Sequence, residues 1–214
     1  MYKQAFSLIL VTIFTAACHS SDDSSSSNIK EVFVTQASIT GDITGGDFTN
    51  YPQGMVWEAT ICADLTAIEC ANLYCQREAE YRNYSTSPAN LFSAWLSDST
   101  VNAKDNIRYS SDNQYVRAID NSVVIAQPGS LIVSSGQPVN LSNAVNNTDY
   151  SVWTGTGING TISLDVAGCN NWTESSSATN NIQGQSNADN DAWTLVSTAG
   201  STCSSSARIY CFER

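Results

Sequence analysis

Seven cysteines are the residues of this chain best suited to chemistry, because a thiol can form a disulfide, bind a metal or act as a nucleophile. They are Cys18, Cys62, Cys70, Cys75, Cys169, Cys203 and Cys211. An odd number leaves one thiol over when the others pair, which needs an explanation in an exported protein. Their chemistry therefore depends on whether the chain is exported and on the fate of one cysteine.

Histidine-dependent chemistry is ruled out for nearly all of the chain, because His19 is its only histidine. Ser-His-Asp catalysis, Cys-His catalysis and histidine metal sites all need an imidazole. Aspartate and glutamate number 20, but no two of them stand at a spacing typical of an acid and base pair. We therefore predict no catalytic residue, no metal ligand and no cofactor, and we expect a protein that is not an enzyme.

The bulk composition limits the size of the fold and the class of partner. The 214 residues, 42% of them apolar, suit one globular domain with appendages. The formal net charge is -11, and nucleic-acid phosphates repel such a chain, so we expect no nucleic-acid partner. The composition leaves the oligomeric state open.

Residues 1–18 have the three-part layout of an export signal. Lys3 precedes an apolar run over 5–14 that is too short to span a bilayer, and small residues follow. Residues 15–18, Thr-Ala-Ala-Cys, resemble the bacterial lipobox, in which the cysteine is lipidated and becomes the new first residue. Lipidation of Cys18 leaves six cysteines, an even number. We expect a lipoprotein anchored at the outer membrane or cell surface; the alternative is an ordinary secretory signal with a stray cysteine.

The remaining chain divides into a tether and a folded domain. Residues 19–30 are mostly serine, aspartate and other polar residues, which predicts a flexible tether. The domain is expected over 31–214, with a first strand at 31–35 and a helix within 63–82, capped by Asp64. One or two early helices followed by many short strands predict an α+β domain.

The other elements are short. Residues 91–96 suit a strand or a buried helix, with a short helix after them capped by Ser97 or Ser99, and 37–54 carry four glycines typical of a loop. The later strands are expected at 115–118, 122–126, 130–134, 151–154, 161–166, 192–196 and 207–212. In an oxidising compartment the six cysteines of the domain predict up to three disulfides, with 15 possible pairings that spacing alone does not resolve.

An ordered series of motifs resembles a bacterial family of exported proteins that are similar to endostatin, the C-terminal domain of collagen XVIII. Besides a cysteine-bearing helix, the motifs are EVFVT, AWLSDST, YVRAIDNSVVI, VWTGTGINGT, CNNWTES and STCSSSARIYCFER. The resemblance covers about residues 31–214 and implies a C-type-lectin-like fold with the first and last strands side by side. It also implies two nested disulfides, Cys75 with Cys211 and Cys169 with Cys203, which leaves Cys62 and Cys70, without a counterpart in that pair, to bond each other.

The resemblance implies a binding function without the calcium chemistry of true C-type lectins. Residues 137–140, Gln-Pro-Val-Asn, lack the carboxylate of the lectin calcium loop, and Trp172 is followed by threonine and glutamate. Relatives act as adhesins for matrix or serum proteins, so an extracellular protein ligand is implied. One alternative is a carbohydrate-binding or calcium-assisted module, with Asp189 and Asp191 as oxygen ligands. Another is an enzyme of the formylglycine-generating type, which uses paired catalytic cysteines.

The ligand-binding residues are not identified by sequence. The two long loops, at 37–56 and 174–191, are where we expect them, because binding residues concentrate on loops. The tryptophans could stack on sugar rings, but large rings near strands and bridged cysteines more often fill the core. We expect that structural role for most of Trp57, Trp95, Trp153, Trp172 and Trp193, with Trp57 the least settled.

Overall fold

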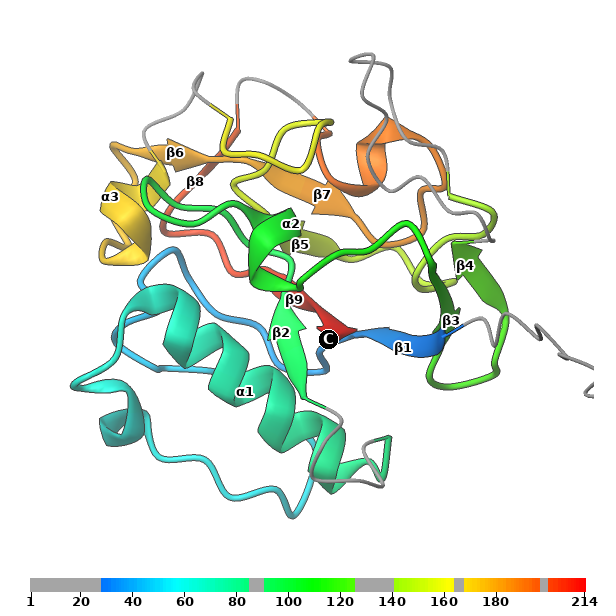
Figure 1. The fold of residues 1–214 in the computed structure, drawn as a ribbon. Helices are drawn as coiled ribbons and strands as arrows, with labels where there is room; N and C mark the ends of the chain where they lie inside the picture. Colours follow the sequence, from blue (N-terminus) through cyan, green and yellow to red (C-terminus); the bar gives the residue numbers. More distant parts are fainter. Residues whose placement is uncertain (1–27, 85–90, 126–140, 164–167, 197–199) are drawn as a thin grey trace, which may run out of the picture.

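The computed structural model describes residues 28–84, 91–125, 141–163, 168–196 and 200–214 (Figure 1). The expected export signal at 1–18, the strand at 130–134 and the segment 137–140 lie outside these residues. The helical elements are η1 (Ala59–Cys62), α1 (Ala67–Tyr81), α2 (Ala103–Asn106), α3 (Gly168–Trp172) and η2 (Asp191–Trp193). None of the helices in the described ranges is long and apolar enough to cross a membrane.

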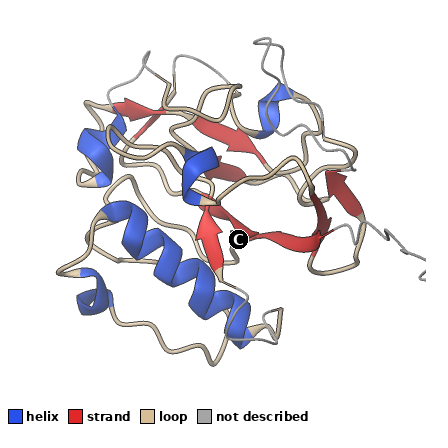
Figure 2. Ribbon diagram, viewed as in Figure 1, coloured by secondary structure: helices blue, strands red, loops and turns tan. Residues whose placement is uncertain are grey.

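The strands form a mixed, curled sheet, so the α+β class is confirmed. They are β1 (Asn28–Val34), β2 (Phe92–Ala94), β3 (Asn113–Arg117), β4 (Val123–Ile125), β5 (Ser151–Trp153), β6 (Asn180–Asn181), β7 (Gln183–Gln185), β8 (Ser201–Thr202) and β9 (Arg208–Glu213). Figure 2 shows that loops connect these short strands and that α1 is the one long helix of the described part.

Strand β9 lies at the centre of the sheet. The strand order is β4-β3-β1-β9-β5-β7, and β2 also pairs with β9, while β6 and β8 form a separate pair. One edge of β9 pairs antiparallel with β1, and the other pairs first with β5 and then with β2. The first and last strands therefore lie side by side, as the resemblance implies.

The sheet is buried on both faces. Successive residues of a strand point to opposite sides of the sheet, and in β9 the residues on each side belong to a buried core. In β9, Ile209 and Cys211 belong to the core beneath α1, whereas Tyr210 and Phe212 belong to the core on the other face. Each large apolar side chain buried in this way contributes about 1.5–3 kcal/mol. The expected core role is confirmed for the four tryptophans Trp95, Trp153, Trp172 and Trp193, all of which are buried.

Helix α1 begins later than expected, because Thr66 rather than Asp64 caps it. The Thr66 hydroxyl accepts a hydrogen bond from the Glu69 N–H, and the Glu69 carboxylate accepts one from the Thr66 N–H at 2.9 Å. This reciprocal capping box satisfies two N–H groups at the helix start. The same hydrogen bond from the Thr66 N–H lowers the pKa of Glu69.

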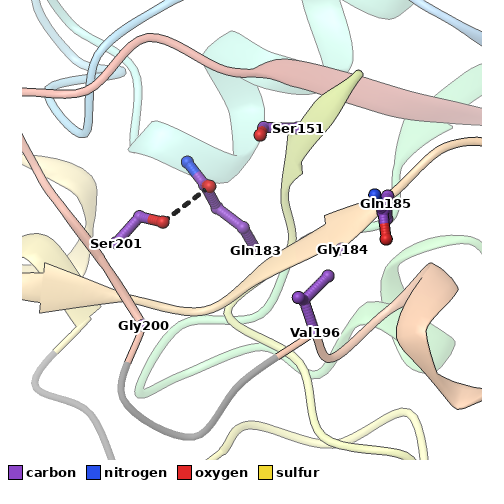
Figure 3. Close-up of a pocket in the computed structure, with 7 residues that line it drawn as sticks. All are labelled: Ser151, Gln183, Gly184, Gln185, Val196, Gly200 and Ser201. Carbon is purple, nitrogen blue, oxygen red and sulfur yellow. Dashed lines mark hydrogen bonds between the residues drawn. The ribbon is translucent and has the colours of Figure 1, made fainter. Parts of the chain in front are cut away.

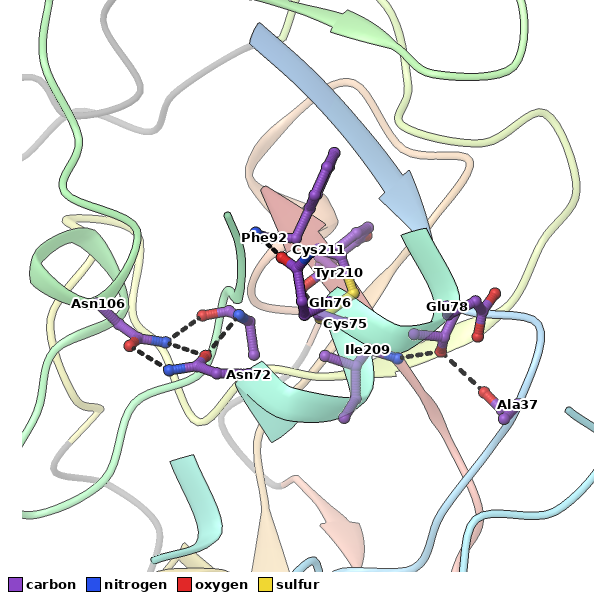
Figure 4. The surroundings of a disulfide bond; sticks show 12 residues. Ala37, Asn72, Cys75, Gln76, Glu78, Phe92, Asn106, Ile209, Tyr210 and Cys211 are labelled. Carbon is purple, nitrogen blue, oxygen red and sulfur yellow. Dashed lines mark hydrogen bonds between the residues drawn. A yellow bond between two sulfur atoms is a disulfide. The ribbon is translucent and has the colours of Figure 1, made fainter. Parts of the chain in front are cut away.

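Helix α1 also satisfies the free edge of β2, next to the Cys75–Cys211 disulfide (Figure 4). The Asn72 Oδ1 accepts from the Ala94 N–H at 2.8 Å, and the Gln76 Oε1 accepts from the Phe92 N–H at 2.9 Å. The two side chains are four residues apart on one helix face, and their donors are two residues apart on the strand. An edge that would otherwise be open to another chain is therefore covered.

The segment labelled α3 is a left-handed turn rather than an ordinary α-helix. All five of its residues have positive φ, from 48° at Cys169 to 66° at Trp172. Such a conformation costs about 1–2 kcal/mol for each residue with a side chain, so tertiary contacts must hold it. Cys169 is bonded to Cys203, and the Trp172 Nε1–H donates to the Ser97 carbonyl at 2.8 Å.

Three further expectations about local structure are wrong. Residues 192–196 are not a strand, because the Asn190 side chain accepts from the Ala192 N–H and starts the 3-10 turn η2. Residues 28–30, expected in the tether, pair with β3 as the start of β1. Neither serine is the N-cap residue of α2, which follows Asn102, although the Ser97 hydroxyl accepts from its first N–H.

The long disulfide should contribute more stability than the short one. The chain separation is 136 residues for Cys75–Cys211 and 8 for Cys62–Cys70. The loop-entropy relation gives about 5 kcal/mol for the first bridge and about 2.5 kcal/mol for the second. We expect the double alanine variants to lose free energy of unfolding in that order, measured by urea unfolding. Equal losses would contradict the entropic explanation.

Candidate functional site

The segment 51–61 runs along α1 and is held there by side-chain hydrogen bonds. The Tyr81 hydroxyl donates to the Gln53 carbonyl, and the Trp57 Nε1–H donates to the Gly46 carbonyl at 2.8 Å. The Trp57 ring packs edge-on against Tyr74 of α1, and the Cys62–Cys70 bridge ties the end of the segment to the start of the helix. Trp57 is half-buried and so has a structural role as well.

Large apolar side chains are exposed along this segment. Val56 is 83% exposed, Ile61 and Tyr81 are each 44% exposed, and Tyr51 is 38% exposed. These are four of the eight exposed large apolar side chains among the described residues. Single exposed apolar residues are normal, but a cluster of them is typical of an interaction site.

Two hollows lie within this cluster, and we call them together the α1 groove. One has a volume of about 330 Å³ and is lined by Gly54, Met55, Val56, Arg77, Glu80 and Tyr81. The other has a volume of about 270 Å³ and is lined by Val56, Trp57, Glu58, Ile61 and Arg77. Val56 and Arg77 belong to both hollows, so the groove is continuous across these two side chains.

The rim of the α1 groove is charged. Arg77 lies 3.6 Å from Glu80, and both side chains are about half exposed. Glu58 is also exposed. An exposed ion pair of this kind contributes little to stability, so these groups can pair with a ligand at low cost. The groove therefore combines the exposed apolar side chain of Val56 with charged and other polar groups, a mixture that is common in protein interfaces.

Beneath the groove, Glu78 and Arg82 form a buried ion pair. The Arg82 Nη2 lies 2.5 Å from the Glu78 Oε1, which also accepts from the Gln36 N–H at 2.7 Å. Burial raises the pKa of Glu78 more than Arg82 lowers it, whereas Glu78 raises the pKa of Arg82 against the effect of burial. A carboxyl group with a raised pKa is a catalytic candidate only in a cleft. Glu78 is not among the lining residues of the α1 groove. Its role is structural, because its hydrogen bond from the Gln36 N–H connects α1 to the chain after β1.

A third cavity, of about 200 Å³, lies beside β7 (Figure 3). Its lining comprises Ser151, Gln183, Gly184, Gln185, Val196, Gly200 and Ser201. The Ser201 hydroxyl donates to the Gln183 Oε1 at 2.7 Å, and the Gln185 amide donates to Asp149 at 2.9 Å. This lining has neither an aromatic ring for stacking on a sugar nor a charged group for acid–base chemistry. It is a weaker candidate than the α1 groove.

All six described cysteines form disulfides. The pairs are Cys62–Cys70, Cys75–Cys211 and Cys169–Cys203, which are the pairs that the resemblance implies. Cys18, the expected lipidation site, lies outside the described residues. The bridged cysteines lie in the core or against it, and they position α1, α3 and the chain between them rather than a reacting group.

The first part of the first expected ligand loop is anchored in the core by alternate residues. Ala37, Ile39, Ile43 and Phe48 are buried, and only the part from Asn50 onward opens onto the α1 groove. Gly41 packs against the inner disulfide, where an added Cβ would lie 2.4 Å from the Cys169 Sγ. One sequence signal could have located the groove. The segment 51–61 carries several apolar residues that do not follow the periodicity of a helix or a strand, so they are not all expected in the core.

The second expected loop also contains structural elements. Its centre forms β6 and β7, and Ile182 is fully buried. Asp189 and Asp191 are exposed in the turn before Trp193, where the Asp191 carbonyl accepts from the Thr194 N–H. Within the described ranges, no group of three or more histidine, cysteine, aspartate or glutamate residues could hold a metal ion.

A scan against models of known protein families finds no match to this chain, and a search of curated proteins also finds none. The function is therefore inferred from the residues and their geometry. The α1 groove is the surface whose exposure, shape and composition favour binding most clearly.

Replacing Arg82 with methionine tests the buried pair beneath the groove. We expect the free energy of unfolding at about pH 7 to fall by about 3 kcal/mol, because Glu78 is left buried without its partner. Burial holds the folded-state pKa of Glu78 above its ordinary value of 4.5, and this change raises it further. The folded protein then binds a proton that the unfolded chain has released, so stability falls as the pH rises above 4.5.

The control is Arg77→Met, which removes the exposed ion pair with Glu80 on the same helix. We expect a change of less than about 0.5 kcal/mol that does not vary with pH. Urea unfolding from about pH 5 to about pH 8 measures both variants. A loss for Arg82→Met that is the same throughout this range would mean that the charge of Glu78 is not the cause.

Proposed function

We propose that this chain is an exported bacterial lipoprotein whose domain binds an extracellular protein at the cell surface. The domain is proposed to be C-type-lectin-like and related to endostatin. The paired first and last strands and the two nested disulfides, Cys75–Cys211 and Cys169–Cys203, support that assignment.

Lipid anchoring at Cys18 is supported by the lipobox-like residues and by cysteine parity. The other six cysteines pair among themselves, so Cys18 is the odd thiol. Only residues 19–27 separate it from the start of β1 at Asn28. Fully extended, this tether spans about 30 Å. The domain would stand close to the outer membrane surface.

The observation that carries the binding function is the α1 groove. Its lining includes Trp57, Arg77 and Tyr81, which are of the residue types that contribute most to protein interfaces. In Figure 1 the start of β1 lies at the right of the domain, whereas the segment 51–61 runs below α1 along the lower edge, so a tether at β1 begins away from the groove.

A catalytic function has less support. Formylglycine-generating chemistry needs a pair of free thiols, and the six described cysteines are all in bridges. Glu78, a carboxyl group whose pKa is raised by burial, is fully buried beside Arg82. We therefore assign the domain a binding role.

Acylation of Cys18 can be measured directly. We expect the unmodified chain, produced in a bacterium with lipoprotein processing, to begin at an acylated Cys18 and to fractionate with the membrane. Cys18→Ser should remove the acyl group and the membrane attachment, because a thiol is needed for the linkage. Intact-mass analysis of both proteins is the measurement. An unmodified Cys18 in a cleaved, freely diffusing protein would support the ordinary secretory signal instead.

Protein binding through the groove is tested by surface plasmon resonance. The protein is the chain from residue 18 onward with the substitution Cys18→Ser, and its possible ligands are a panel of matrix and serum proteins. We expect binding of at least one panel protein and an affinity loss of about tenfold or more for Val56→Asp, since a charge is placed in the apolar centre. Ile119→Asp is the matched control, because Ile119 is another highly exposed aliphatic residue, outside the groove. Equal losses for the two variants would exclude the groove as the binding surface.

A further inference from the structure

We infer that the α1 groove binds a cationic amphipathic segment of its partner. The apolar side chains of the bound segment would pack beside Val56, and the lysine or arginine side chains of that segment would lie near Glu58 and Glu80. This inference rests on the protein-binding function proposed above and specifies the chemistry of the ligand.

The hollows fit apolar anchor side chains. The exposed Val56 lines both hollows. Met55 and Tyr81 line the first hollow, and Trp57 and Ile61 line the second. Together the two volumes, about 330 Å³ and about 270 Å³, accommodate a few side chains rather than a whole domain. An amphipathic segment that presents apolar residues on one face is the usual occupant of such a groove.

The charge of the surroundings selects a cationic occupant. Glu58 and Glu80 lie on the rim, Asp64 and Glu69 are exposed nearby on the turn after η1 and the start of α1, and Arg77 is the one basic residue of the lining. The whole chain carries a net charge of -11, which attracts a cation over a longer range. A second copy of the chain carries the same charge and is therefore disfavoured.

The groove is held in shape before any ligand arrives. The Cys62–Cys70 bridge and the Tyr81 hydrogen bond to Gln53 attach the segment to α1, and the Trp57 hydrogen bond to Gly46 attaches it to the preceding loop. A surface that is already ordered loses little conformational entropy on binding. A short peptide with the correct chemistry is therefore a sufficient probe.

The probe is a synthetic amphipathic helical peptide of leucine and lysine, and its counterpart of leucine and glutamate is the negative control. Binding to the Cys18→Ser chain is measured by fluorescence anisotropy at low and at physiological salt. We expect the lysine peptide to bind at least tenfold more tightly than the glutamate peptide. The double variant Glu58→Gln and Glu80→Gln should weaken binding about threefold to tenfold and reduce its salt dependence.

Val56→Asp separates the groove from general charge attraction. The variant makes the protein more acidic, so a peptide held by net charge alone would bind it as well as before or better. We expect instead a loss of about tenfold or more, with Ile119→Asp unchanged within about twofold. Retained binding to Val56→Asp, or equal binding of the two peptides, would overturn the inference.

The two proposals can fail separately. A panel protein whose binding is lost in Val56→Asp, together with a lysine peptide that does not bind, would keep the protein-binding function and overturn the cationic ligand. A lysine peptide that binds in the groove without binding by any panel protein would support the ligand chemistry and exclude those panel proteins as the partner.

Discussion

The pairing of β9 with the strands on both of its edges is the constraint on which the rest of the fold depends. Strands β1, β2 and β5 each have backbone hydrogen bonds to β9, and they come from widely separated parts of the chain. The Cys75–Cys211 disulfide also attaches α1 to β9. Loop closure over such distances costs entropy, which the two buried cores and the covalent bond offset.

Helix α1 separates the structural part of the molecule from the proposed binding surface. Its inner face packs on the sheet, accepts hydrogen bonds from the β2 backbone through Asn72 and Gln76, and pairs Glu78 with Arg82. Its outer face, with the segment 51–61, forms the α1 groove. On this outer side, Tyr81 and Trp57 hold the segment in place, whereas Val56, Arg77 and Glu80 are exposed and available to a ligand.

Most of the regular structure in the described ranges could be predicted from the sequence. The strands at β1, β3, β4, β5 and β9 and the long helix follow from β-branched residues and apolar spacing. The apolar run 192–196 suggested another strand, but the short-range cap from Asn190 makes it a 3-10 turn. The strand propensity of tryptophan, threonine and valine does not show that a side-chain hydrogen bond from a preceding residue will start a turn instead.

Other features depend on contacts that no local pattern contains. The left-handed turn from Gly168 to Trp172 exists because a disulfide and a buried indole hold it. The burial of Glu78 depends on Gln36 and Arg82, of which Gln36 lies 42 residues away in the chain. The α1 groove likewise requires Val56 and Arg77 to meet, and the sequence places them in separate elements. The sequence therefore predicted the part of the site in the loop 37–56, but not the part that α1 contributes through Arg77, Glu80 and Tyr81.

The central place of β9 has a consequence for biosynthesis. Every other strand of the sheet precedes β9 in the chain, so during translation β1, β2 and β5 are made before the strand that joins them. The sheet therefore stays incomplete until β9 has been synthesised. Cys75 also cannot pair with Cys211 before that segment is made, so the central strand and its covalent link to α1 both become available late in synthesis.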